Sequence, residues 1–246
     1  MATRIKFCGI TRLEDAEHAV TLDAWAVGLI LWPGSPRYCR PADAAAIGAA
    51  LHRRAEVAGV FVNAHLDHVV TRADEFNLSL IQLHGDEGPS FCTEVARRTG
   101  ARVIKVARVR GASDVQALRA FRTDYHLLDA YVADAPGGTG ETFAWELVRL
   151  HRRDRPVILS GGLNADNVGE AIAATYPYAV DVASGVERSP GIKDHAKMDA
   201  FSAAVRAADA GPEGEGEEGQ AGSAEADGNG ASPSATAFTA SEGSAA

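Results

Sequence analysis

Short apolar segments rich in β-branched residues alternate along the chain with longer amphipathic segments, and this alternation constrains the fold more than any other feature. The apolar segments are RIKFC, WAVGLI, VAGVFV, LIQL, RVIKVA, YHLLD, PVILS and YAVDVA. Between them lie helical patterns such as LEDAEHAV, PADAAAIGAAL, SFCTEVARR and ADNVGEAIAA. Strands that alternate with helices form right-handed βαβ units around a parallel sheet.

Eight such units in residues 1–208 predict a (β/α)₈ barrel, the TIM-barrel fold, at the small end of its size range. The alternative is an open, doubly wound parallel sheet. The first turn from strand to helix, CGITRLED, lacks the G-x-G-x-x-G pattern of the dinucleotide-binding form of that fold. We therefore expect one barrel domain that carries the functional site.

From residue 209 to residue 246 the composition changes to Gly, Ala, Ser and acidic residues, with one aromatic residue and no Lys or Arg. Such a segment buries too little apolar surface to offset the loss of chain entropy, so we predict a disordered acidic C-terminal tail. Its acidic residues are Asp209, Glu213, Glu215, Glu217, Glu218, Glu225, Asp227 and Glu242. The tail solubilises the protein or has no role, or it binds a partner.

The tail also accounts for most of the net charge of −9, because the rest of the chain has 25 acidic and 24 basic residues. The predicted barrel therefore has no basic field that would attract nucleic acid. No apolar run is long enough to span a membrane, and the first residues, MATRIKFCGI, lack the apolar core of a signal peptide. Three scattered cysteines form neither a disulfide framework nor a zinc-binding spacing. We expect a reduced, cytoplasmic protein without nucleic-acid or membrane partners.

The carboxyl ends of the predicted strands indicate where function should lie, because TIM-barrel active sites are built there. The first strand ends at Cys8 and the sixth at Asp129. A cysteine taken alone is more often a buried packing residue than a reactive one. Because Asp129 converges on the same rim, a chemical role becomes the stronger interpretation for Cys8.

Two loops of small residues follow the seventh and eighth strands, where TIM barrels often bind phosphate. LSGGLNADN places Gly161 and Gly162 before Asn164, a candidate N-cap of the next helix. ASGVE places Ser184 and Gly185 after the eighth strand. Backbone N–H groups at glycines can approach an anion closely, and a helix N-terminus adds a favourable dipole. The two loops together predict a phosphate site, although glycines also serve simply as tight turns.

Other polar side chains lie near predicted strand ends. Arg37, on the loop after the second strand, is either a solvated surface cation or a bidentate clamp on a carboxylate or phosphate. His84, after the fourth strand, is either a catalytic base or a hydrogen-bonding rim residue beside Gln82. The remaining histidines form no metal-binding set. Cys39 and Cys92 lie away from strand ends, where packing is the plain interpretation.

These residues lie in motifs that resemble those of phosphoribosylanthranilate isomerase of tryptophan biosynthesis. The motifs are KFCGITRLEDA, VGLILWPGSPRY, GVFVN, IQLHGDE, LLDA, GGTGETF, LSGGLNADNV and VDVASGVERSPGIKD. The resemblance runs from Arg4 to about Ala208, and K-x-C-G-I-T and PG-x-KD are its most specific parts. It implies a (β/α)₈ barrel that performs a cofactor-free Amadori rearrangement on a phosphorylated small molecule, N-(5-phosphoribosyl)anthranilate.

The resemblance also implies roles for individual residues. Cys8 would be the general base, Asp129 the general acid and Arg37 the group that meets the anthranilate carboxylate, while the two glycine loops would hold the phosphate. The expected substrate-binding residues are Lys6, Arg37, Gln82, His84, Gly161, Gly162, Asp181, Ser184 and Gly185.

The chemistry requires opposite protonation states for the acid and the base near pH 7. We therefore expect a raised pKa for Asp129 and a lowered pKa for Cys8. Lys6 is a candidate to stabilise the thiolate, and it shares a strand face with Cys8 only if the strand is regular.

Two positions depart from the family's usual pattern. The loop after the sixth strand reads GTGETFAW where the family often has GTGKTFDW, so that Glu141 replaces a cation and Ala144 replaces a carboxylate. We expect that loop to close over the substrate, where a reversed charge near a dianionic ligand would change affinity or closure.

Two other functions stay open at the level of the sequence. One is a related or broadened-specificity sugar-phosphate isomerase, but such enzymes typically pair two carboxylates across the barrel, whereas this chain has Cys8 and Asp129. The other is a non-catalytic barrel that binds a phosphorylated metabolite, and the presence of both these residues with Arg37 and the glycine loops argues against it. We expect a monomer or a homodimer.

Overall fold

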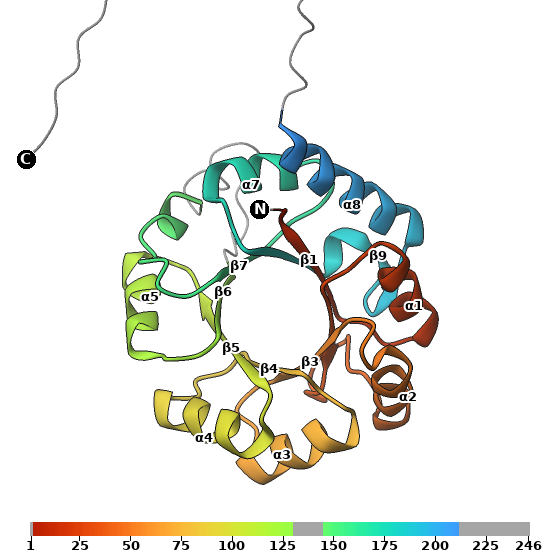
Figure 1. Cartoon of the computed structure of the whole chain (residues 1–246), viewed down its shortest axis with the longest axis vertical. Coiled ribbons are helices and arrows are strands. Elements are labelled where there is room, and N and C mark those ends of the chain that lie inside the picture. Colours follow the sequence, from red (N-terminus) through yellow and green to blue (C-terminus); the bar gives the residue numbers. More distant parts are fainter. Residues whose placement is uncertain (1, 130–144, 212–246) are drawn as a thin grey trace, which may run out of the picture. The chain divides into compact units, whose positions relative to one another are not determined.

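The computed structural model describes residues 2–129 and 145–211 of the chain. Eight parallel strands form a closed barrel in chain order, as the end-on view in Figure 1 shows. The strands are β1 (Arg4–Cys8), β2 (Ala26–Ile30), β3 (Glu56–Phe61), β4 (Leu80–Leu83), β5 (Arg102–Arg108), β6 (Tyr125–Asp129), β7 (Val157–Ser160) and β8 (Ala179–Val182). The predicted (β/α)₈ barrel is confirmed, and the open sheet is wrong because β1 pairs with β8.

The helices surround the strands in a ring (Figure 1). They are α1 (Leu13–Thr21), α2 (Pro41–Leu51), α3 (Leu66–Glu75), α4 (Pro89–Thr99), α5 (Ala112–Ala117), α7 (Val168–Thr175) and α8 (His195–Ala210), with 3₁₀ turns η1 (Leu118–Ala120) and η2 (Ser184–Val186). Between β8 and α8 an antiparallel hairpin intervenes, formed by β9 (Glu187–Ser189) and β10 (Ile192–Lys193). The alternation of strand and helix did not predict this hairpin.

Two expectations from the sequence concern residues that the structure does not describe. The acidic tail predicted from residue 209 lies outside the described residues from residue 212 onward, and α8 continues through Ala210. The loop that carries Glu141 and Ala144 also lies outside the described residues. Both expectations stay predictions.

The barrel has an apolar interior at the amino ends of its strands and a polar one at the carboxyl ends. Inward-facing Ala, Leu and Ile side chains fill the lower layers, because side chains alternate between the two faces of a strand. Below them, Trp25, Tyr125 and Tyr178 pack with ring centroids 5.3 to 5.6 Å apart. The upper end instead buries the charged groups of Lys6 and Asp181. The buried ion pair between Lys6 and Asp181 therefore lies on the side of the barrel mouth.

Behind β6, which carries Asp129, a pair of histidines fixes the strand to the next segment of the chain. His126 Nδ1 lies 2.8 Å from His151 Nε2. The backbone N–H of Arg153 donates to His151 Nδ1, and the carbonyl oxygen of Phe121 lies 3.3 Å from His126 Nε2. Burial and the neighbouring His151 lower the pKa of His126 to about 4, so both rings stay neutral and the hydrogen-bond chain is complete at pH 7.

Close helix packing makes Gly48 of α2 a sensitive position. A Cβ there would lie 1.9 Å from the carbonyl oxygen of Phe76, whereas a Cβ at Gly169 of α7 would meet only Ala208, at 3.9 Å. We predict that Gly48→Ala lowers the free energy of unfolding by about 2 kcal/mol through overpacking. Gly169→Ala, the matched control, raises it by roughly 0.5 kcal/mol because alanine favours the helix. Urea unfolding measures both, and equal effects of the two changes would contradict the packing described.

Candidate active site

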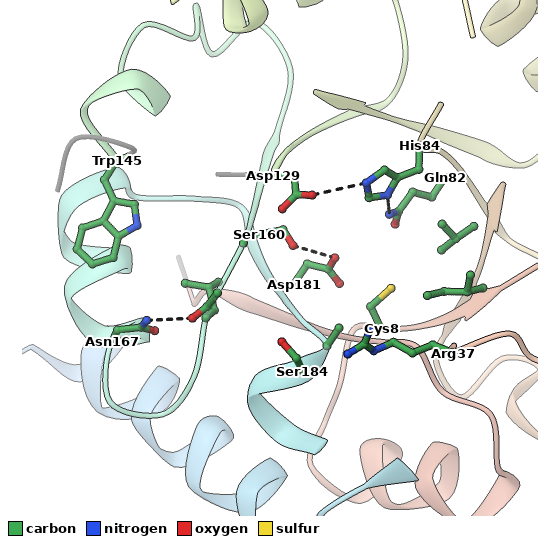
Figure 2. A pocket seen from close by; sticks show the side chains of 16 residues that line it. Cys8, Arg37, Gln82, His84, Asp129, Trp145, Ser160, Asn167, Asp181 and Ser184 are labelled. Atoms are coloured by element: carbon green, nitrogen blue, oxygen red, sulfur yellow. Dashed lines mark hydrogen bonds and ion pairs between the residues drawn. The ribbon is translucent and has the colours of Figure 1, made fainter. Parts of the chain in front are cut away.

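A pocket of about 460 Å³ opens at the carboxyl ends of the barrel strands (Figure 2). Its lining residues are Cys8, Ile30, Arg37, Val60, Gln82, His84, Asp129, Trp145, Ser160, Gly161, Gly162, Leu163, Asn167, Asp181, Ala183 and Ser184. Nine of the eleven predicted site residues are among them. The other two, Lys6 and Gly185, lie behind the lining.

A buried ion pair forms the floor beneath Cys8. Lys6 Nζ lies 2.7 Å from Asp181 Oδ1, and the two residues are direct partners across the β1–β8 junction. Lys6 is fully buried and Asp181 is 5% exposed. Burial opposes the charge on Lys6, but the carboxylate of Asp181 and the neighbouring Cys8 raise the pKa of Lys6 on balance. Lys6 therefore keeps its positive charge directly below the thiol.

The space for Cys8 and Lys6 depends on a glycine in the adjacent strand. Gly28 of β2 pairs with Cys8 across the strands. A Cβ on Gly28 would lie 2.8 Å from Cys8 Sγ and 3.0 Å from Lys6 Nζ. We expect Lys6 and Cys8 to share a strand face only if the strand is regular. This condition is met, because both side chains project from β1 into the barrel interior. Gly9 follows with φ +74°, a left-handed conformation that turns the chain away from the rim.

The predicted lowering of the Cys8 pKa is wrong. Cys8 is only 6% exposed, and burial raises the pKa of its thiol more than the positive charges of Lys6 and Lys193 lower it. The carboxylate of Asp181 raises it further. Burial penalises a thiolate through lost hydration, and the sequence motif alone did not reveal how deeply this thiol lies. The raised pKa that we expect for Asp129 stays a prediction.

Asp129 lies in a group of polar side chains at the ends of β4 and β6 (Figure 2). His84 Nε2 is 3.6 Å from Asp129 Oδ2, and His84 Nδ1 is 3.4 Å from Gln82 Nε2. Gln82 Oε1 is buried and has no hydrogen-bond partner among the described residues. Leaving a buried acceptor without a partner is costly, and Gln82 also lines the pocket.

Arg37 does not behave as a free surface cation. Its Nε lies 2.9 Å from Glu187 Oε1 and its Nη2 lies 2.8 Å from Glu187 Oε2. The Arg37 side chain is 24% exposed and that of Glu187 only 5%. Although burial opposes the charge on Glu187, hydrogen bonds from Arg37 and the nearby ammonium of Lys193 lower its pKa. The guanidinium of Arg37 is therefore held in place by a carboxylate of the protein, and its role as a clamp on a substrate anion stays a prediction.

The two glycine loops meet at the wall beside β7 and β8. Gly161 and Gly162 have φ values of +103° and +64°, which only glycine adopts without strain. A Cβ on Gly185 would lie 2.0 Å from the carbonyl oxygen of Leu163. Gly185 is therefore required for the two loops to pack together, which explains why it lies behind the lining while Ser184 contributes to it.

The helix that follows β7, α7, begins at Val168. Asn164, the predicted N-cap, caps the turn that leads into it. Its Oδ1 accepts the backbone N–H groups of Asp166 and Asn167, and its carbonyl oxygen accepts the backbone N–H of Val168. Asn167 Oδ1 accepts the backbone N–H of Asn164 in return, while Asn167 makes no side-chain cap hydrogen bond to α7. Asn167 Nδ2 donates to the carbonyl oxygen of Gly162 at 3.1 Å, which stabilises the glycine turn.

Sequence reasoning missed three polar or aromatic lining residues and one supporting residue. Ser160 is the last residue of β7, so the same strand-end rule could have found it. Its Oγ lies 3.4 Å from Asp181 Oδ2. Asn167 lies within a motif already singled out. Trp145 and Glu187 gave no local signal, because their positions depend on how distant segments pack.

The other cysteines are buried away from the pocket. Burial raises the pKa of Cys39 to about 12 and that of Cys92 to about 11, as suits packing residues. Among residues 2–129 and 145–211, no cluster of three or more His, Cys, Asp or Glu side chains is arranged to hold a metal ion. No helix in the same ranges is long and apolar enough to cross a membrane.

Known proteins are similar to this chain in sequence and in fold. A family model described as N-(5'phosphoribosyl)anthranilate (PRA) isomerase matches residues 5–204. The N-(5'-phosphoribosyl)anthranilate isomerase of Geobacter sp. (strain M21) is 46% identical over 204 residues, which are 83% of this chain and 98% of the relative. The one from Pseudomonas syringae pv. tomato is 47% identical over 206 residues, with the same two coverages of 83% and 98%.

Two solved structures extend the comparison. Phosphoribosyl anthranilate isomerase from Thermotoga maritima is 40% identical with a TM-score of 0.74, covering 83% of this chain and 98% of its own. A structure of phosphoribosyl anthranilate isomerase in complex with reduced 1-(o-carboxyphenylamino)-1-deoxyribulose 5-phosphate is 37% identical, with a TM-score of 0.71 and the same coverages of 83% and 98%.

The environment of Cys8 makes a prediction about its titration. We expect iodoacetamide to alkylate Cys8 with a pH midpoint above 9.0, the ordinary value for a thiol, because burial disfavours the thiolate. Lys6→Met should move the midpoint higher still, since it removes the nearest positive charge. Mass spectrometry of the peptide that contains Cys8 follows the reaction separately from Cys39 and Cys92. A midpoint at or below about pH 8 would contradict this account of the site.

Proposed function

The chain belongs to the N-(5′-phosphoribosyl)anthranilate isomerase family, and from this membership we infer its reaction. It converts N-(5′-phosphoribosyl)anthranilate to 1-(2-carboxyphenylamino)-1-deoxyribulose 5-phosphate, an aldose–ketose isomerisation of tryptophan biosynthesis. One observation carries the assignment of this activity to the pocket: Cys8 and Asp129 line the same cavity as a fixed arginine and two glycine loops. Each part of the substrate thus has a chemically matched group.

The substrate carries two anionic groups at opposite ends. The loops at Gly161–Gly162 and at Ser184 present backbone N–H groups at the wall formed by β7 and β8, and they take the phosphate. Arg37 takes the anthranilate carboxylate, because a guanidinium matches a carboxylate with two parallel hydrogen bonds. Gln82, which lines the same pocket, binds a hydroxyl of the sugar.

Ring opening begins the reaction. Asp129 donates a proton to the furanose ring oxygen, the bond from that oxygen to C1′ breaks, and C1′ becomes a protonated Schiff base with the anthranilate nitrogen. His84, 3.6 Å from the Asp129 carboxyl, orients this group. General acid catalysis of this kind contributes about 10²–10⁴ in rate.

Proton transfer at carbon follows. Cys8 as thiolate removes the C2′ proton, and the electrons of that bond form a C1′=C2′ double bond and neutralise the iminium nitrogen. The resulting enolamine gains a proton at C1′ and loses the one on its C2′ hydroxyl, which gives the ketone. All substrate atoms are retained and no net oxidation occurs, so the reaction requires no redox cofactor.

The high pKa of Cys8 has two opposite consequences. Only a minor fraction of the thiol is ionised near pH 7, but the thiolate that does form is a stronger base. Lys6, Lys193 and Arg37 all interact electrostatically with Cys8, and these positive charges stabilise the thiolate.

We further propose a cytoplasmic protein that is a monomer or a homodimer. A solved relative from Thermotoga maritima is described as a dimeric phosphoribosylanthranilate isomerase, which supports the second arrangement. Light scattering of the purified chain distinguishes the two.

Growth of a tryptophan auxotroph that lacks this isomerase tests the function. We expect the unmutated gene to restore growth without tryptophan and Cys8→Ala to fail, because it removes the base. Cys92→Ala, at a buried cysteine outside the pocket, is the matched control and should still restore growth. Failure of the unmutated gene, with soluble protein present in the cells, would contradict the assigned activity.

A further inference from the structure

The β9–β10 hairpin lies beside α1, outside the ring of barrel strands (Figure 1). It contributes no residue to the lining of the pocket. The PG-x-KD motif, from Pro190 to Asp194, spans its turn and second strand. Neither the barrel nor the chemistry described above explains why these residues are present.

Glu187 of the hairpin uses only some of the N–H groups of Arg37. A guanidinium has five N–H groups. Arg37 uses its Nε–H and one N–H of Nη2 on the carboxylate of Glu187, the first residue of β9. Its Nη1 has no protein partner among residues 2–129 and 145–211. The end of the guanidinium, formed by Nη1 and the second N–H of Nη2, is therefore left for a second carboxylate.

The rest of the Arg37 side chain is also confined. A Cβ on Gly9 would lie 2.9 Å from Arg37 Cδ, so the aliphatic part of the arginine passes directly over this glycine. The backbone N–H of Arg37 donates to Ser35 Oγ at 3.1 Å. In Figure 2 the side chain extends beside Cys8. Only the guanidinium would be free to rotate without Glu187.

Glu187 is itself held from the opposite side. Lys193 Nζ, on β10, lies 3.0 Å from Glu187 Oε1 and 3.0 Å from the carbonyl oxygen of Ala183. The backbone N–H of Gly191 donates to Glu187 Oε1 at 3.2 Å. Lys193 is 1% exposed and Glu187 7%. A buried carboxylate between two cations has one orientation, since any other leaves charges unpaired.

We propose that Glu187 is a positioning residue for Arg37, and that the β9–β10 hairpin serves to present the free end of this guanidinium to the substrate carboxylate. Lys193 balances the charge of Glu187, so that Arg37 keeps its attraction for a second anion. The inference rests on the proposed function, in which Arg37 binds the anthranilate carboxylate.

The test compares two ligands that differ only in that carboxylate. They are reduced 1-(2-carboxyphenylamino)-1-deoxyribulose 5-phosphate and the corresponding reduced phenylamino compound. Calorimetry gives the ratio of their dissociation constants for the wild type, Glu187→Gln and Arg37→Ala. We expect Glu187→Gln to reduce the carboxylate preference about tenfold, which is the scale of one charge-assisted hydrogen bond. The affinity for the phenylamino compound should stay within about twofold.

A double variant shows whether Glu187 acts through Arg37. In the Arg37→Ala background, adding Glu187→Gln should leave the ligand ratio unchanged, because there is no guanidinium left to position. Glu187→Asp keeps the negative charge beside Lys193 but shortens the reach, and it should lose the preference as Glu187→Gln does. Glu17→Gln breaks a comparable two-bond ion pair with Arg54 on the outer surface and should change neither constant.

The outcomes separate the inference from its premise. If Glu187→Gln leaves the ligand ratio unchanged, or weakens both ligands equally, the positioning role is overturned while the function stands. If Arg37→Ala leaves the ratio unchanged, Arg37 does not bind the carboxylate and the inference falls with that assignment. If the wild type binds neither ligand, the proposed function itself is overturned.

Discussion

The buried ion pair between Lys6 and Asp181 joins the first and last strands at the mouth of the barrel, and the pocket is built on it. Moving two charges out of water costs several kcal/mol for each ion, and only close, well-oriented pairing offsets that cost. The 2.7 Å contact lies exactly where β1 and β8 are in register. Because the loss of either partner would leave a buried charge unpaired, the polarity of the pocket floor depends on both.

A second set of buried charges, Arg37, Glu187 and Lys193, lies at the side of the pocket. The cations Lys6, Lys193 and Arg37 and the carboxylate of Asp181 all interact with the thiol of Cys8. Burial raises the Cys8 pKa more than Lys6 and Lys193 lower it, and burial therefore decides the direction in which this pKa moves. This explains how a site with several positive charges can nevertheless hold a protonated cysteine, whose thiolate is a strong base when it forms.

Local patterns in the sequence were sufficient to predict the barrel and most of the pocket lining. Strand periodicity and the rule that barrel sites lie at strand ends identified Cys8, Asp129 and the two glycine loops. They could not identify interactions between distant segments. Arg37 and Glu187 are 150 positions apart, and the direction of the Cys8 pKa shift depends on its burial and on Asp181 in the last strand. The capping side chain of Asn164 could be predicted from the sequence, but its reciprocal hydrogen bond with Asn167 Oδ1 is apparent only in the folded turn.

The central claim is that Cys8 removes the C2′ proton of the substrate. Turnover of substrate carrying deuterium at C2′, compared with unlabelled substrate, tests this most directly in the wild type and in Cys8→Ser. A serine hydroxyl is scarcely ionised near neutral pH and removes the proton more slowly, so the account predicts that Cys8→Ser turns over at least about 100-fold more slowly. It also predicts a larger deuterium isotope effect in the variant, because C–H cleavage then limits the rate. An unchanged rate with an unchanged isotope effect would contradict the assignment of Cys8 as the base.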